Sequence, residues 1–139
     1  MIVNKNGEKL LIKEKYTKEA GYKWNLVKGT YDNPNETLED CVKREVEEEV
    51  GLRGVSMVGL KRIYHYGSAK EPKILFVFEL EYLGDLVASL KNNQHDEDIV
   101  EIRWLKKPEI EAISKEDYMG AYVYGALKTD QKDLLIAKI

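Results

Sequence analysis

The stretch from Thr37 to Gly51 constrains the fold most, because its pattern predicts one long helix with a buried face. Apolar residues recur along it at every fourth position: Leu38, Val42, Val46 and Val50. Side chains at this spacing lie on one side of a helix, so they predict a stripe that packs against a core, with Cys41 at its edge. Thr37 and Asp40 fit the capping box that begins a helix, and Gly51 suits the left-handed residue that ends one.

The same helix carries an acidic face. Glu45, Glu48 and Glu49 fall at positions i, i+3 and i+4, which gathers three carboxylates on one side, while Glu47 points away from them. Like charges at this spacing repel by about 0.2–0.5 kcal/mol per pair, so a positive partner is expected among them. Carboxylate oxygens are ligands that Mg²⁺ and Mn²⁺ prefer, and Mg²⁺ commonly bridges carboxylates to phosphates. The pattern therefore predicts a divalent metal site.

The residues around this helix resemble the Nudix box of the MutT-like Nudix hydrolases, with the pattern G-x5-E-x7-R-E-U-x-E-E-x-G-U, in which U is aliphatic. From Glu36 onward every fixed position is met: Glu36, Arg44, Glu45, Val46, Glu48, Glu49, Gly51 and Leu52. The one departure in the box, which spans Gly29–Leu52, is that six residues and not five separate Gly29 from Glu36. The extra residue falls in a turn-rich loop, where insertions are tolerated best.

The resemblance implies an α/β chain of the α+β type with the Nudix fold, a mixed β-sheet sandwiched between α-helices. It also implies hydrolysis of a diphosphate linkage with Mg²⁺, for which Mn²⁺ can substitute, held by Glu45, Glu48 and Glu49. A metal polarises the phosphoryl group and lowers the pKa of a bound water, which then attacks phosphorus. Glu48 or Glu49, or a carboxylate outside the box, would be the general base.

Three further box residues are assigned supporting roles by the resemblance. Arg44 is grouped with the catalytic residues because it would orient the box carboxylates through a salt bridge; an ordinary i, i+4 partner of Glu48 is the alternative. Glu36 would stabilise the loop or the helix start, where an acid also complements the helix dipole. Gly51 would end the helix.

Composition is compatible with a single domain over residues 1–139. Hydrophobic residues make up 43% of the chain, enough for a core at this length, and the net charge of −3 gives no basic excess for an extended nucleic-acid footprint. Cys41 is the only cysteine, so no intrachain disulfide can form. The sequence shows no signal peptide and no apolar run of about 20 residues that could span a membrane. We therefore expect a cytoplasmic protein.

Outside the box, alternating and apolar runs predict strands. They are Lys9–Lys13, paired with Ile2–Val3, then Lys23–Leu26, Val55–Tyr66, Lys73–Leu83 and Ile99–Leu105. The run Ile74–Phe78 is apolar enough to predict a central strand that is covered on both faces. Pro108 predicts the start of a helix, and Met119–Leu127 predicts another.

Lys28 and Gly29 stand where many Nudix relatives have two glycines, whereas relatives acting on diadenosine polyphosphates and inositol pyrophosphates often have Pro-Lys-Gly. A lysine beside the metal site would contact a polyphosphate as a mobile point charge; a solvent lysine is the alternative. Tyr31, in the same loop, is the aromatic residue most expected to be exposed and to stack on a nucleobase. Stacking is also open to three others, for which a core position is the stronger expectation: Trp24, Tyr64 and Tyr66.

A second acidic group precedes the last predicted strand. It consists of Asp96, Glu97, Asp98 and Glu101. Relatives often bring a further carboxylate from this region towards the metal or the base, and Glu97 and Glu101 are the preferred candidates for substrate binding. A charged surface loop is the alternative.

These patterns lead to an enzyme that hydrolyses a nucleotide or nucleotide derivative, with a dinucleoside polyphosphate favoured through Lys28. The alternatives are a nucleoside triphosphate pyrophosphohydrolase of the housekeeping type and a non-catalytic Nudix-like module that binds nucleotides. Such modules usually lose one or more box glutamates, and all are retained here. Because many relatives dimerise, a homodimer is a further expectation.

Overall fold

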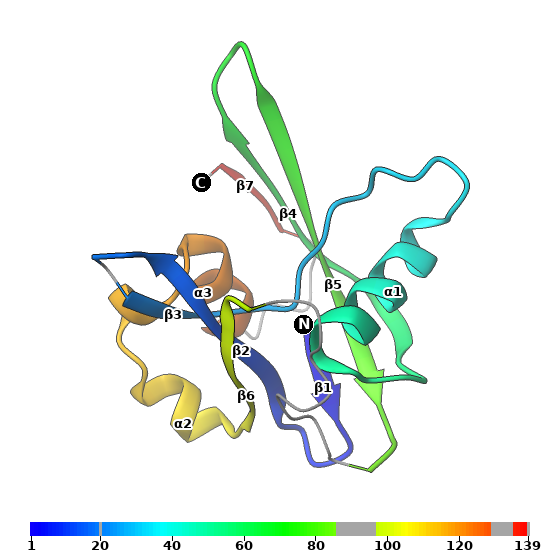
Figure 1. Ribbon diagram of the computed structural model, residues 1–139, viewed down its shortest axis with the longest axis vertical. Helices are drawn as coiled ribbons and strands as arrows, with labels where there is room; N and C mark the ends of the chain where they lie inside the picture. The colour runs from blue at the N-terminus through cyan, green and yellow to red at the C-terminus, as the bar shows by residue number, and fades with distance from the viewer. Residues whose placement is uncertain (20, 86–96, 129–134, 139) are drawn as a thin grey trace.

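The structure is a computed structural model that describes residues 1–19, 21–85, 97–128 and 135–138. Its strands are β1 (Ile2–Asn4), β2 (Lys9–Thr17), β3 (Gly21–Asn25), β4 (Ser56–Gly67), β5 (Pro72–Tyr82), β6 (Ile99–Leu105) and β7 (Leu135–Lys138). Its helices are α1 (Leu38–Val50), α2 (Lys107–Ala112) and α3 (Ala121–Lys128), with a 3₁₀ turn at Lys115–Asp117. The strands form one sheet with helices on both sides (Figure 1), which confirms the predicted fold class.

The sheet is mixed, as expected. Its order is β3-β2-β1-β5-β4-β7, and β6 pairs with β2. β1 runs antiparallel to β2 but parallel to β5, and β7 runs parallel to β4. The predicted pairing at the start of the chain is confirmed, with Ile2 opposite Leu10, and the predicted strand Ile99–Leu105 is β6.

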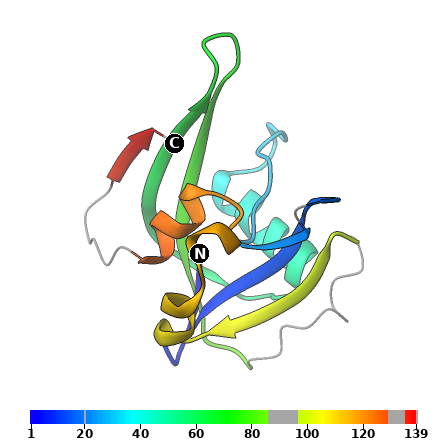
Figure 2. The ribbon, with the colours of Figure 1, turned by 90° about the vertical axis from the view of Figure 1, so that its left-hand side faces the viewer.

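Each face of the sheet has its own apolar core. On one face, Val46 and Val50 of α1 pack in a cluster with Leu10 and Ile12 of β2. On the other face, Leu11 of β2 packs in a cluster with residues of α2 and α3. Figure 2 shows α2 and α3 in front of the sheet and α1 behind it. Successive side chains of β2 thus point to opposite faces of the sheet, so each face packs against its own helical layer.

The sheet opens between β3 and β5. β1 and β3 both pair with β2, but β1 meets β5 only at Leu80–Tyr82. The first half of β5 therefore runs beyond β1, in a long hairpin with β4 that projects from the body of the molecule (Figure 1). This opening leaves space beside the loop that follows β3.

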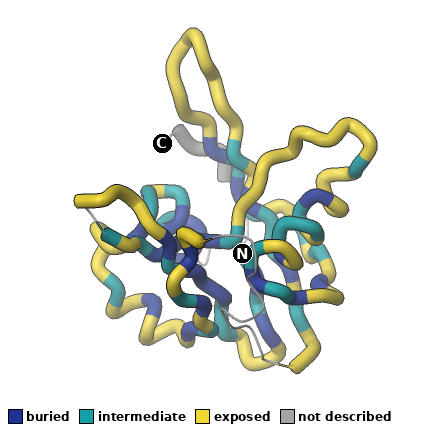
Figure 3. The backbone as a smooth tube through the Cα atoms, in the orientation of Figure 1, coloured by how far each residue is buried: buried dark blue, intermediate teal, exposed yellow. Residues whose placement is uncertain are grey.

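The prediction that Ile74–Phe78 is covered on both faces is wrong. Val77 is buried, but Ile74 is 62% exposed and Phe76 is 41% exposed. The run is central in the sheet order, yet it lies in the projecting part of the hairpin, whose tip is exposed, as is the loop before α1 (Figure 3). An apolar run alone does not show how far a hairpin extends beyond the layers that cover it.

Helix α1 begins and ends as the sequence predicts. The Thr37 hydroxyl accepts from the Asp40 N–H, and the Asp40 carboxylate accepts from the Thr37 N–H at 3.2 Å, completing the capping box. Gly51 ends the helix at φ 70° and donates to the Glu47 carbonyl. The predicted buried stripe needs one correction: Leu38 is 41% exposed, because it is the first residue of the helix and lines a cavity instead of the core.

The loop between β3 and α1 is tied to the helix at Glu36. Its carboxylate accepts two hydrogen bonds from the Arg44 guanidinium, at 3.0 Å from Nη2 and 3.2 Å from Nε. Its carbonyl accepts from the Tyr31 hydroxyl at 2.8 Å. Bidentate pairing of this kind fixes geometry as well as charge, so the loop has a defined path despite its extra residue.

Replacing Gly51 with alanine should destabilise the protein by about 1–2 kcal/mol, because a side chain disfavours the left-handed conformation. Urea unfolding measures the change. Gly59→Ala is the matched control, since Gly59 has no positive φ and nothing lies within 4 Å of a Cβ added there. Equal stability of the two variants would contradict the role of Gly51.

The Glu36–Arg44 pair should make the stability of the fold depend on pH. Hydrogen bonding from Arg44 holds the pKa of Glu36 below its ordinary value, so the pair stabilises the fold above the unfolded-state pKa. That contribution is lost as the pH falls through the lowered folded-state pKa. Glu36→Gln should therefore lower the melting temperature at neutral pH, and the difference from wild type should shrink on acidification.

Thermal unfolding from about pH 7 to about pH 3 tests this dependence. Glu39→Gln is the control, because it removes one negative charge from the exposed Lys43–Glu39 pair of the same helix. A difference between Glu36→Gln and wild type that stays constant down to the lowest pH would show that the pair contributes nothing.

Candidate active site

Arg44 is the centre of the acidic face of α1. Besides its two bonds to Glu36, its Nη1 donates to Glu45 at 2.8 Å and to Glu48 at 3.1 Å. Hydrogen bonds that Arg44 donates to Glu36 and to Glu45 raise the pKa of its guanidinium above the ordinary value. One cation thus holds three carboxylates, and the i, i+4 pairing with Glu48 is only part of its role.

Gly29 lies directly against Glu45. A Cβ added at Gly29 would stand 2.0 Å from Cδ of Glu45, closer than any side chain tolerates. Since φ of Gly29 is not positive, the glycine is needed here for this close approach and not for an unusual backbone. The loop and the helix can meet at the box carboxylates only because this residue has no side chain.

Glu49 contacts the loop from the other side of the acidic face. Its Oε2 accepts from the main-chain N–H of Lys28 at 3.2 Å. Glu47, by contrast, pairs with Arg53 at 2.6 Å, away from the other acids, as the helical spacing predicts. The structure therefore brings together Lys28, Gly29, Arg44 and the three acids at positions 45, 48 and 49.

The chemistry of this donor set fits a hard divalent cation, because Glu45, Glu48 and Glu49 offer carboxylate oxygens on one helix face. The carboxylates of Glu45 and Glu48 are turned to Arg44, whereas Glu49 is turned to Lys28. As they stand, no three or more His, Cys, Asp or Glu side chains among the described residues are grouped so that they could hold a metal ion. The Glu48 side chain, about half exposed, is the freest of the pair at Arg44 to turn towards a cation.

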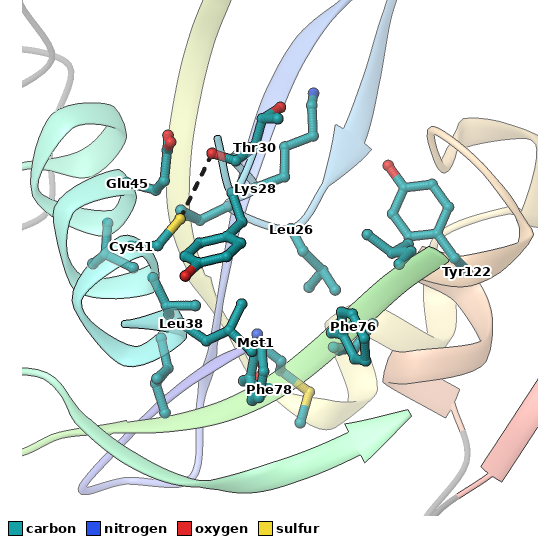
Figure 4. A pocket seen from close by; sticks show the side chains of 18 of the residues that line it. Met1, Leu26, Lys28, Thr30, Leu38, Cys41, Glu45, Phe76, Phe78 and Tyr122 are labelled. Atoms are coloured by element: carbon teal, nitrogen blue, oxygen red, sulfur yellow. Dashed lines mark hydrogen bonds between the residues drawn. The ribbon is translucent and has the colours of Figure 1, made fainter. Parts of the chain in front are cut away.

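A cavity of about 590 Å³ lies beside these carboxylates, where the sheet opens (Figure 4). Its walls come from the loop after β3, from α1 and from β5. The lining is mainly apolar and includes Leu26, Tyr31, Leu38, Val42, Phe76 and Phe78, with Glu45, Lys28 and Gly29 also in its wall. An apolar chamber with charged groups in its wall is the usual form of a small-molecule site.

The aromatic candidates divide between the cavity and the core. Tyr31 is half exposed and lines the cavity, as does Tyr66. Trp24 and Tyr64 are buried in the core of the α2 and α3 side, where we expected them if they do not stack on a ligand. Cys41 is buried, and burial raises the pKa of its thiol, which agrees with a packing role.

Glu101, from the second acidic group, is not brought to the box. Glu101 pairs with Arg103 at 3.7 Å and lies opposite Lys13, whose ammonium stacks over Trp24 of the α2 and α3 side. Directly opposed residues share a face of the sheet, so Glu101 lies on the face away from α1. Glu97 is exposed and does not line the cavity. Asp96 lies outside the described residues.

Sequence reasoning missed a buried polar group next to Lys28, formed by Glu14, Asn25 and Tyr122. Glu14 is only 5% exposed. Its carboxylate pairs with the Lys28 ammonium and accepts a hydrogen bond from the Asn25 amide. A signal was present, because Glu14 continues the alternation of Leu10 and Ile12 on the face of β2 that packs against α1. An acid that continues an apolar alternation is a candidate for a buried, paired carboxylate.

Comparison with known proteins agrees with this arrangement. The model of the family described as NUDIX domain matches residues 1–123. A search of curated proteins gave no match. Solved structures show the same fold: a NUDIX hydrolase from Nitrosomonas europaea has a TM-score of 0.75 at 22% identity, covering 99% of this chain and 75% of that chain.

Two further solved structures are similar in fold. The MutT protein from Methanosarcina mazei Go1 has a TM-score of 0.65 at 24% identity, covering 92% of this chain and 86% of that chain. A C. elegans Ap4A hydrolase in a binary complex has a TM-score of 0.63 at 21% identity, covering 91% of this chain and 88% of that chain. With the family match over most of its length, the chain belongs to the NUDIX domain family.

Proposed function

We propose that the protein hydrolyses the diphosphate linkage of a nucleoside diphosphate linked to another moiety, using a divalent cation at Glu45, Glu48 and Glu49. The observation that carries the proposal is that Glu45 belongs both to the carboxylate group held by Arg44 and to the wall of the apolar cavity. An anhydride at the carboxylates would thus place an organic group in the cavity. The cavity volume of about 590 Å³ lies in the usual range for small-molecule sites.

The side chains of this chain divide the work of such a reaction. A bound cation would polarise the phosphoryl group and neutralise developing charge. Arg44 orients Glu45 and Glu48, and Gly29 lets the loop approach them. Glu48 or Glu49 is the candidate to accept the proton of the attacking water, since both lie on the same helix face. Little covalent work is left to the protein, so positioning carries the rate.

Within this class we favour a dinucleoside polyphosphate as the substrate. Lys28 lines the cavity, and its ammonium, which pairs with Glu14, could also bind a phosphate of the substrate. Tyr31 and Phe76 supply aromatic surface for a nucleobase in the same cavity. The fold similarity to a protein named as an Ap4A hydrolase is consistent with this choice. A nucleoside triphosphate is the second candidate, and a non-catalytic nucleotide-binding module is the third.

The proposal extends to the setting of the reaction. Mg²⁺ is the proposed natural ion, with Mn²⁺ as a substitute, and residues 1–139 are proposed to act as one domain in the cytoplasm. In the described part of the chain, no helix is long and apolar enough to cross a membrane. The homodimer stays a prediction, which size-exclusion chromatography with light scattering would measure.

Glu48→Gln should lower turnover by about 100-fold or more, the usual contribution of a positioned proton acceptor or metal ligand. The measurement is release of AMP or phosphate with Mg²⁺ from diadenosine polyphosphates, nucleoside triphosphates and ADP-ribose. Glu47→Gln is the matched control, because Glu47 is the adjacent residue but pairs with Arg53 away from the site. Turnover by neither wild type nor variant would favour the binding module, and equal turnover would remove Glu48 from the reaction.

Gly29→Ala should weaken Mn²⁺ binding, because the new methyl group would displace the carboxylate of Glu45 or push the loop away from it. The loss should be about 10-fold or more, as for other changes that misplace a metal ligand. Titration calorimetry with Mn²⁺ alone measures it, with Gly59→Ala as the control for the substitution itself. Unchanged affinity in a folded Gly29→Ala protein would show that the close approach does not serve the metal site.

A further inference from the structure

Glu14 is a buried acid that lies outside the box pattern but next to its loop. It stands on β2, on the sheet face that packs against α1, and it is 5% exposed. An ionised carboxylate is costly to bury unless it is paired and hydrogen-bonded. The structure meets that condition with two partners, Asn25 and Lys28.

Asn25 fixes where the Glu14 carboxylate lies. Its Nδ2 donates to Oε1 of Glu14 at 2.6 Å. Its own Oδ1 accepts from the Leu26 N–H at 2.9 Å and from the Tyr122 hydroxyl at 2.8 Å. Asn25 is fully buried, and burial raises the pKa of Tyr122 to about 12, so this hydroxyl keeps its proton and remains a donor. Strands β2 and β3 and helix α3 thus hold the acid in one place.

Lys28 links this buried group to the box helix. Its ammonium pairs with Oε1 of Glu14, while its main-chain N–H donates to Oε2 of Glu49. The side chain of Lys28 is 46% exposed, whereas that of Glu14 is 7% exposed. The main chain of Lys28 therefore contacts Glu49, while its ammonium is held by a buried acid.

Glu49 is the other carboxylate that Lys28 contacts, through its main-chain N–H. The four-carbon stem of lysine is flexible enough to turn its ammonium back along the chain. An ammonium on Glu49 would occupy carboxylate oxygens that a cation needs and would repel that cation. A buried ion pair is often no more stabilising than an apolar pair of similar size, so stability alone does not explain why Glu14 is charged.

We propose that Glu14 is a positioning residue that holds the ammonium of Lys28 away from Glu49, so that the box carboxylates can take up a divalent cation. The inference rests on the proposed metal site and deepens it, because it explains how a lysine and a cation share one small region. Lys28 also lines the cavity, where an additional phosphate of the substrate would lie.

The test is a double-mutant cycle read by calorimetry with Mn²⁺ and no substrate. Glu14→Gln should weaken Mn²⁺ binding by about 10-fold or more, in the range for residues that orient metal ligands. Lys28→Met should bind Mn²⁺ at least as tightly as wild type. In the double variant Glu14→Gln/Lys28→Met the loss caused by Glu14→Gln should disappear, because the Lys28 ammonium is no longer present to pair with Glu49.

The cycle separates positioning from simple charge. If Glu14 acted only as a distant negative charge or as a metal ligand, its removal would weaken binding equally with and without Lys28, and the two effects would add. Additive effects therefore overturn the proposal, as does unchanged affinity of Glu14→Gln. No Mn²⁺ uptake by the wild-type protein would instead overturn the proposed metal site itself, together with this inference.

Two further variants keep the test decisive. Glu79→Gln is the matched control, because it breaks a partly buried lysine–glutamate pair, with Lys61 at 3.0 Å, and removes the same charge elsewhere. Glu14→Asp retains the charge and should keep Mn²⁺ affinity close to that of wild type, and loss of binding in this variant counts against the proposal. Melting temperatures of all variants confirm that each is folded.

Discussion

The guanidinium of Arg44 is the interaction on which the site depends. It joins Glu36, in the loop before α1, to Glu45 and Glu48 on the helix. Without such a cation, the acids of the helix would repel one another, and the loop would have no charged anchor at its end. Arg44 therefore does two things at once: it stabilises an acidic helix face and it fixes the loop that covers it.

The topology of the sheet places a cavity next to this face. β1 is short and meets β5 only at Leu80–Tyr82, so the sheet opens between β3 and the projecting part of β5. The loop after β3 crosses the opening and carries Lys28 and Gly29 to the helix. A short strand, a long hairpin and one glycine together shape a mainly apolar chamber with Lys28, Glu45 and Lys73 in its wall.

Much of α1 could be predicted from sequence because its determinants are local. The capping box at Thr37, the ending at Gly51 and the outward direction of Glu47 follow from spacing within a few turns, and the structure has all three. Leu38 and Ile74 were misjudged because exposure depends on which distant segment covers a residue. The resemblance located the acidic face, but it could not show that Arg44 holds two of its acids together with Glu36 of the loop.

Glu14 shows the limit of such reasoning most clearly. Its place on the α1 side of β2 could be read from its alternation with Leu10 and Ile12, but its partners lie on β3, on α3 and in the loop. Pairing between segments so far apart is a property of the folded chain. Motif patterns record residues close together in sequence, so a buried acid on a separate strand escapes them.

The charged side chains around the site are mostly negative. Among the described residues, five carboxylates, those of Glu14, Glu36, Glu45, Glu48 and Glu49, lie around two cationic side chains, Lys28 and Arg44. The Lys28 ammonium pairs with Glu14, and the Arg44 guanidinium pairs with Glu36, Glu45 and Glu48, so these carboxylates outnumber the cations paired with them. A phosphate anhydride is itself anionic and would be repelled by such a face. We therefore expect the proposed substrate to approach this face together with a divalent cation, as the proposed metal site requires.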